Sequence, residues 1–270
     1  MAATLPRRVV EPAAAGLGRL YGSASRADAS AVRENLKAAL PGCTDQGLSA
    51  LTLEVFENYS AYLVDLFYAL EGAEAFRRRL ECSGLHRLDR ALAGGRGVVA
   101  VSAHVGHWER AGMALALSGY RLKALAVRHR DPSVERFFER RRSAYGVGIV
   151  HLDGSLRECY RHLSAGGVLG VNADRLYGEG GHPVEFLGRT VGFPQGPARI
   201  AARCGAPLLP VFMIMAPEGR LRLEVGEELP SDDPARTTAA YARCLERVVR
   251  THPTQWFLFQ RYWEAPQWPD

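Results

Sequence analysis

One segment of the chain combines residue types that could carry acid-base chemistry. Residues 102–109 read SAHVGHWE, so that His104 precedes Glu109 by five positions. A neutral imidazole can take a proton from a hydroxyl group, and a nearby carboxylate can hold the ring in the tautomer that this step requires. We therefore predict that His104 is a general base and that Glu109 orients it. The spacing alone is equally compatible with a salt-bridged helix cap.

The same segment offers ligands for a metal ion. His104, His107 and Glu109 are residue types that ligate zinc, and a zinc-bound water would make the protein a metal-dependent hydrolase. A reinforcing H-E-x-x-H pattern is missing from the sequence. The five cysteines lie far apart and form no C-x-x-C pair; they are Cys43, Cys82, Cys159, Cys204 and Cys244. We expect no bound metal, and the hydrolase remains the alternative function.

The elements on either side must position this segment. The apolar run 97–103 predicts a strand that ends just before His104, and the helix expected over 109–118 has Glu109 in its first turn. Open α/β folds place their ligand sites at the carboxyl ends of such strands. The sequence therefore predicts an imidazole at a sheet edge, with a carboxylate close enough to fold back onto it.

From about residue 95 onward, short β-branched runs alternate with amphipathic stretches. Further strands are expected over 122–127, 148–152, 168–173, 207–215 and 220–225, and further helices over 132–145, 155–164, 195–204 and 234–251. A hairpin is expected around residues 187–189. This alternation predicts a single α/β domain whose mixed, largely parallel sheet is flanked by helices, with helical N-terminal elements.

The N-terminal part of the chain has a different pattern. Its first thirty residues are rich in Ala, Gly and Arg, so we expect residues 1–30 to form a poorly ordered or short-helical lead-in and residues 31–270 to form the domain. Helices are expected over 31–40 and 45–70. The second carries an apolar and aromatic stripe, which indicates packing against the sheet; the alternatives are a wall of an acyl pocket or a membrane-facing surface.

The charge balance suits an anionic partner. The 270 residues include 34 Lys plus Arg against 29 Asp plus Glu, which gives a net charge of +5. Phospholipid, acidic carrier protein and nucleic acid are all anionic. A nucleic-acid-binding module is the weaker alternative, because no basic motif is interleaved with aromatic residues. No apolar run approaches the ~18 residues of a spanning helix, so we expect no transmembrane helix and, at most, attachment to a membrane surface.

Several blocks of the sequence occur in an order that resembles one known superfamily. Segment 102–109 is similar to the His-x4-Asp/Glu block of the lysophospholipid acyltransferase superfamily. Its form is typical of the lauroyl and myristoyl acyltransferases of lipid A biosynthesis and of the related phosphatidylinositol mannoside acyltransferases. Further blocks match in the same order, at 33–36, 56–59, 127–128, 142–146, 174, 186–188, 196–201, 206–211, 253–256 and 260–263. The resemblance covers residues 31 to 264.

The resemblance implies a function that the spacing alone does not give. It implies an O-acyltransferase that moves a fatty acyl group from acyl carrier protein or coenzyme A to a hydroxyl of a lipid or glycolipid, such as a lipid A precursor. No resident cofactor is implied, and the enzyme would be bound peripherally to the cytoplasmic face of the inner bacterial membrane. The residues expected to contact substrate are Arg128, Arg142, Asp174, Arg175 and Gly188. Arg128 would hold a phosphate or phosphopantetheine group, and Asp174 would orient Arg128 or an acceptor hydroxyl.

Overall fold

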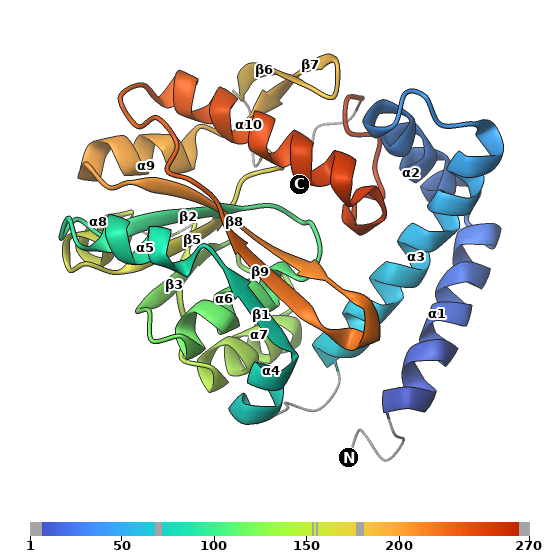
Figure 1. Cartoon of the computed structure of the whole chain (residues 1–270), viewed down its shortest axis with the longest axis horizontal. Coiled ribbons are helices and arrows are strands. Elements are labelled where there is room, and N and C mark those ends of the chain that lie inside the picture. Colours follow the sequence, from blue (N-terminus) through green and yellow to red (C-terminus); the bar gives the residue numbers. More distant parts are fainter. Residues whose placement is uncertain (1–6, 68–71, 153, 155, 177–180, 265–270) are drawn as a thin grey trace.

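A seven-stranded sheet forms the centre of the molecule (Figure 1). The computed structural model describes residues 7–67, 72–152, 154, 156–176 and 181–264. Across the sheet the strand order is β1-β9-β8-β2-β5-β3-β4. The strands are β1 (Leu80–Ser83), β2 (Val98–Ser102), β3 (Leu122–Ala126), β4 (Gly148–His151), β5 (Val168–Asn172), β8 (Leu208–Met215) and β9 (Leu221–Val225). Strands β8, β2, β5, β3 and β4 are parallel to one another, whereas β9 is antiparallel to β8 and parallel to β1. The expected mixed, largely parallel sheet is confirmed.

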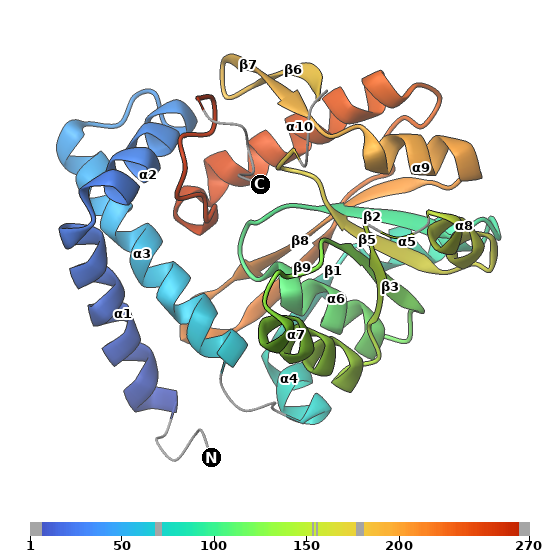
Figure 2. The ribbon, with the colours of Figure 1, turned by 180° about the vertical axis from the view of Figure 1, so that it is seen from behind.

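Helices cover both faces of the sheet because alternate strand residues are apolar on both sides (Figures 1 and 2). In β2, Val99 and Val101 belong to one core, and Val98 and Ala100 belong to the other. The first core is closed by α8 (Arg157–Ser164), α9 (Gly196–Cys204), α10 (Pro234–Thr251) and the hairpin β6 (His182–Phe186) and β7 (Arg189–Phe193). The second is closed by α4 (Ala73–Arg79), α5 (Leu85–Leu92), α6 (Trp108–Leu117) and the end of α7 (Pro132–Ala144).

Three N-terminal helices stand beside the sheet (Figure 2). They are α1 (Arg7–Ala24), α2 (Arg26–Ala39) and α3 (Asp45–Phe67). The boundary that we expected at residue 31 falls inside α2, and the segment before it forms α1, which packs along α3. Gly18 permits this close approach, because a Cβ atom there would lie 2.5 Å from the carbonyl oxygen of Phe56. Among the described residues, no helix combines the length and apolar character needed to cross a membrane.

The sequence pattern did not predict the elements between residues 73 and 92. Helix α4, strand β1 and helix α5 were not expected, because β1 is mostly exposed at the sheet edge and the two helices have only 7 and 8 residues. The hairpin turn is confirmed: Leu187 and Gly188 both have positive φ, at 52° and 77°, as a two-residue turn requires. Two single-turn helices, η1 (Pro217–Gly219) and η2 (Pro253–Gln255), complete the described elements.

Candidate active site

His104 and Asp174 meet at the carboxyl ends of two neighbouring parallel strands. Ser102 at the end of β2 pairs with Asn172 at the end of β5, and each of the two site residues follows its strand by two positions. The His104 Nδ1 atom lies 2.8 Å from Oδ1 of Asp174, and the backbone N–H of His104 donates to Oδ2 at 3.0 Å. The carboxylate therefore fixes both the ring and the backbone of His104.

The Asp174 carboxylate is buried but remains charged. Its side chain is 1% exposed, whereas that of His104 is 15% exposed. Burial alone would raise the pKa of Asp174, but the charge of His104, their hydrogen bonds and the nearby Arg175 lower that pKa below its ordinary value. An ionised carboxylate can only accept hydrogen bonds, so a neutral His104 ring would carry its proton on Nδ1 and present the lone pair of Nε2.

Glu109 does not take the position that the sequence suggested. We expected its carboxylate to hold the His104 ring; instead, both of its oxygens accept from Arg142, with Oε1 2.7 Å from Nη2 and Oε2 3.0 Å from Nε. Burial would raise the pKa of Glu109, but Arg142 first, and then His107 and His104, lower it. Asp174 reaches the ring more directly because it lies in register on the adjacent strand.

The turn between His104 and α6 is held by backbone contacts. Gly106 has a φ of 58°, and a Cβ atom there would lie 2.0 Å from the carbonyl oxygen of Met213. The N–H of Gly106 donates to the carbonyl of Gln255 at 2.8 Å, and the N–H of Phe257 donates to the carbonyl of His104 at 3.1 Å. The C-terminal segment after α10 thus supports the position of the imidazole.

A buried charge network ties this turn to α3. Asp65 on α3 accepts from Nη1 of Arg79 at 3.0 Å and from Nε of Arg110 at 3.1 Å, and Nε2 of His107 lies 3.1 Å from its Oδ2. Burial would raise the pKa of Asp65, but His107 and the two arginines lower it well below its ordinary range. Trp108, beside His107, makes an edge contact with His104 and stacks on Tyr62 of α3. Asp65 could not be recognised from the sequence, because a single acidic residue in a helix is common.

Comparison with known proteins assigns the chain to a family. The sequence model of the family described as bacterial lipid A biosynthesis acyltransferase matches residues 1–265. The chain belongs to this family. It is 30% identical to a phosphatidylinositol mannoside acyltransferase of Mycobacterium tuberculosis (strain ATCC 25618 / H37Rv) over 247 residues, covering 87% of this chain and 77% of the relative. It is also 28% identical to the protein of that name from Mycolicibacterium smegmatis, covering 73% and 70% of the two chains. A lipid A biosynthesis acyltransferase of Haemophilus influenzae is 21% identical, covering 94% and 81%.

Family membership makes the protein an acyltransferase, and the resemblance read from the sequence blocks is confirmed. The arrangement of donor atoms is unfavourable to the zinc interpretation of segment 102–109. His104 faces Asp174, His107 faces Asp65, and Glu109 faces Arg142, so these three side chains do not converge. Within the described part of the chain, the group of side chains that could hold a metal ion lies elsewhere, on α7 and β4.

The other four residues that we predicted to contact substrate lie at separate positions in the structure. Arg128 follows β3 by two residues and is exposed at the same carboxyl edge as His104. Arg175 is half-buried beside Asp174 and donates to the carbonyl of Phe257 at 2.9 Å. Arg142 is buried against Glu109 and over the Phe138 ring, so its guanidinium is engaged by protein groups. Gly188 lies at the tip of the β6–β7 hairpin, where its positive φ accounts for a glycine.

Proposed function

We propose that this acyltransferase moves a fatty acyl group from a thioester, on acyl carrier protein or coenzyme A, to a hydroxyl of a lipid or glycolipid. The observation that carries the proposal is the pair of His104 and Asp174 at the carboxyl edge of the sheet. The family match and the names of the relatives support the acyl transfer and a lipid acceptor. A basic imidazole oriented by a buried carboxylate is the group that such a reaction needs.

In the proposed reaction, Nε2 of His104 takes the proton of the acceptor hydroxyl. The oxygen attacks the thioester carbonyl, a C–O bond forms, and the C–S bond breaks. The leaving thiolate then takes the proton from the imidazolium, so the histidine ends as it began. Asp174 holds the ring and stabilises its charged form. The acyl group passes directly to the acceptor, and the enzyme itself is never acylated.

The donor has anionic groups that match the arginines of this edge. We propose that Arg128, which is exposed at the end of β3, binds a phosphate of coenzyme A or of the phosphopantetheine arm. Arg142 is proposed to act indirectly, because it already pairs with Glu109. Arg142 holds the Glu109 carboxylate in place. The negative charge of Glu109 then lowers the free-energy cost of a positively charged His104 imidazolium.

The acceptor is proposed to reach the enzyme at a membrane surface, on the cytoplasmic face of the inner membrane. Helix α1 has apolar side chains that face away from α3: Leu17 and Leu20 are each 67% exposed, and Val9 is 49% exposed. Amphipathic helices with such faces lie in the interface of a bilayer without crossing it. A Leu17→Asp, Leu20→Asp variant should cosediment less with phosphatidylglycerol vesicles than the unchanged protein. Equal cosedimentation would count against α1 as the contact surface.

A direct test uses purified protein with a radiolabelled acyl thioester and a lipid acceptor. Separate reactions should offer acyl-coenzyme A or acyl carrier protein as donor, and phosphatidylinositol mannoside or a lipid A precursor as acceptor. His104→Ala should abolish formation of labelled lipid while leaving the circular dichroism spectrum unchanged. His86→Ala removes an exposed histidine on α5 and should retain full turnover. Transfer by His104→Ala at the normal rate would refute the proposed base.

A further inference from the structure

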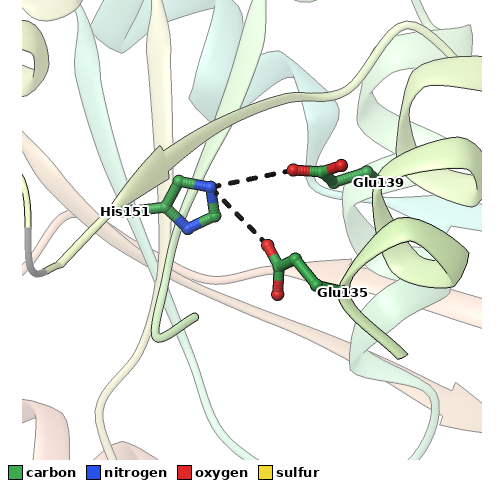
Figure 3. Close-up of side chains that lie close together, drawn as sticks. All are labelled: Glu135, Glu139 and His151. Atoms are coloured by element: carbon green, nitrogen blue, oxygen red, sulfur yellow. Dashed lines mark ion pairs between the residues drawn. The ribbon is translucent and has the colours of Figure 1, made fainter. Parts of the chain in front are cut away.

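Three potential metal ligands gather where α7 packs on β4, away from His104. Glu135 and Glu139 lie one helical turn apart on α7, and both carboxylates point toward the imidazole of His151 at the end of β4 (Figure 3). Nε2 of His151 is 3.6 Å from Oε1 of Glu135 and 4.0 Å from Oε1 of Glu139. All three ligand atoms lie within 4.8 Å of one another.

These separations are longer than hydrogen bonds and close to those around a metal ion. An N–H donor and a carboxylate oxygen that share a hydrogen bond are usually about 2.7–3.2 Å apart. Ligand atoms bound at about 2.0–2.2 Å to one tetrahedral or octahedral ion are roughly 3.0–3.6 Å apart. Side-chain rotations that move the three ligand atoms by about an ångström would therefore let them surround a single cation.

Glu135 is the best-fixed member of the group. Its side chain is 9% exposed, whereas those of His151 and Glu139 are 18% and 45% exposed. One oxygen, Oε2, accepts the backbone N–H of His129 at 2.8 Å, and this bond orients the carboxylate. The other oxygen, Oε1, is directed at His151 and lies 3.6 Å from its Nε2 atom. A carboxylate oriented in this way presents Oε1 beside the imidazole, where both groups can ligate one cation.

We propose that Glu135, Glu139 and His151 bind a divalent transition-metal ion, such as Zn²⁺ or Mn²⁺, that fastens α7 to β4. One imidazole nitrogen and two carboxylate oxygens form a ligand set that such ions accept, with water completing the coordination. The ion has a structural role. Helix α7 also carries Arg142, the partner of Glu109, so fixing α7 fixes that pair. The acyl transfer proposed for His104 does not depend on this ion.

Metal binding can be measured on the full chain. The protein is stripped with a chelator and dialysed, and Zn²⁺ or Mn²⁺ is then titrated by calorimetry and by following the melting temperature. We expect about one ion per chain and a rise in melting temperature with added metal. Glu139→Gln should weaken affinity by more than about tenfold, because even the loss of a group that only supports a metal ligand typically costs 10–100-fold. His151→Ala should remove the metal-dependent rise altogether.

Matched controls separate this site from binding elsewhere. His86→Ala and Glu218→Gln remove exposed groups of the same types outside the trio, and both should bind metal like the unchanged chain. Glu139→Gln keeps the shape of a half-exposed side chain, so it reports on affinity in a folded protein. The proposal is overturned if the unchanged chain binds neither ion, or if Glu139→Gln and His151→Ala bind both ions as tightly as the controls. The latter result would place any bound zinc at another group, such as the exposed Cys82.

Discussion

The carboxylate of Asp174 makes two contacts with His104, to Nδ1 at 2.8 Å and to the backbone N–H at 3.0 Å. These contacts come from strand register: the pairing of Ser102 with Asn172 brings the residues that follow β2 and β5 side by side. The ring can then neither rotate nor exchange tautomers without losing a bond to a buried charge. The sheet itself therefore holds His104 in the orientation that its proposed role as a base requires.

Asp174→Asn should lower kcat by roughly 10²–10⁴-fold with little change in KM. The amide cannot stabilise the imidazolium and favours the wrong tautomer of His104. Steady-state kinetics with a labelled thioester measure both constants. Asp89→Asn, which changes an exposed aspartate on α5, serves as control and should retain activity. If Asp174→Asn kept normal kcat while Glu109→Gln lost it, Glu109 would be the orienting acid.

The ion pair of Glu109 and Arg142 should show strong coupling in a double-mutant cycle. Both side chains are 10% exposed, so removal of one partner leaves a buried charge unpaired. Arg142→Met and Glu109→Leu should each lower the free energy of unfolding by about 3–5 kcal/mol, and the double variant should be more stable than the sum of the two losses implies. Urea denaturation measures this. Strictly additive losses would show that the pair contributes no coupling.

Much of the fold could be predicted because its strands and helices have different apolar periods. The run before His104 and the Pro-containing strand β8 are buried on both faces, and such continuous apolar runs identify central strands. Strand β1 could not be predicted in this way, because three of its four residues are exposed at the sheet edge. The spacing of apolar residues along the chain indicates which side chains are buried. A strand that is exposed at the sheet edge has no such spacing.

The candidate site was predictable in part for a related reason. His104 could be found because its position after an apolar strand is local in the sequence. The resemblance also identified Asp174 as a site residue, but with the role of orienting Arg128 or an acceptor hydroxyl. Its pairing with His104 could not be predicted, because 70 positions separate the two residues and only the alignment of β2 with β5 brings them together. The sequence favours Glu109 as the partner because it lies only five positions from His104. Strand order and register, which a single sequence does not show, decide between the two acids.

Acid should destabilise the protein partly through Asp65. Burial would raise the pKa of this group, but His107, Arg110 and Arg79 lower it below the value of about 3.9 in an unfolded chain. As the pH falls, the unfolded state therefore binds the proton first. The ionised Asp65 contributes fully to the free energy of unfolding above about pH 5, and this contribution is lost as the pH falls toward 2. Asp65→Asn should cost about 3–5 kcal/mol near neutral pH and should flatten the decline in stability below pH 5. Urea unfolding from pH 7 to 2.5 measures both; an unchanged slope in the variant would contradict the assignment.

Gly106→Ala should damage the active site, whereas Gly119→Ala should cost only backbone strain. Both glycines have positive φ, at 58° and 96°, which costs other residues roughly 1–2 kcal/mol. A Cβ atom at Gly106 would also lie 2.0 Å from the Met213 carbonyl oxygen, whereas one at Gly119 would have no neighbour within 4 Å. The turn must shift at Gly106, and His104 moves with it. We therefore expect Gly106→Ala to lose more stability and at least about tenfold in kcat, while Gly119→Ala keeps normal kcat. Equal kinetics for the two variants would show that the close contact with Met213 does not position the imidazole.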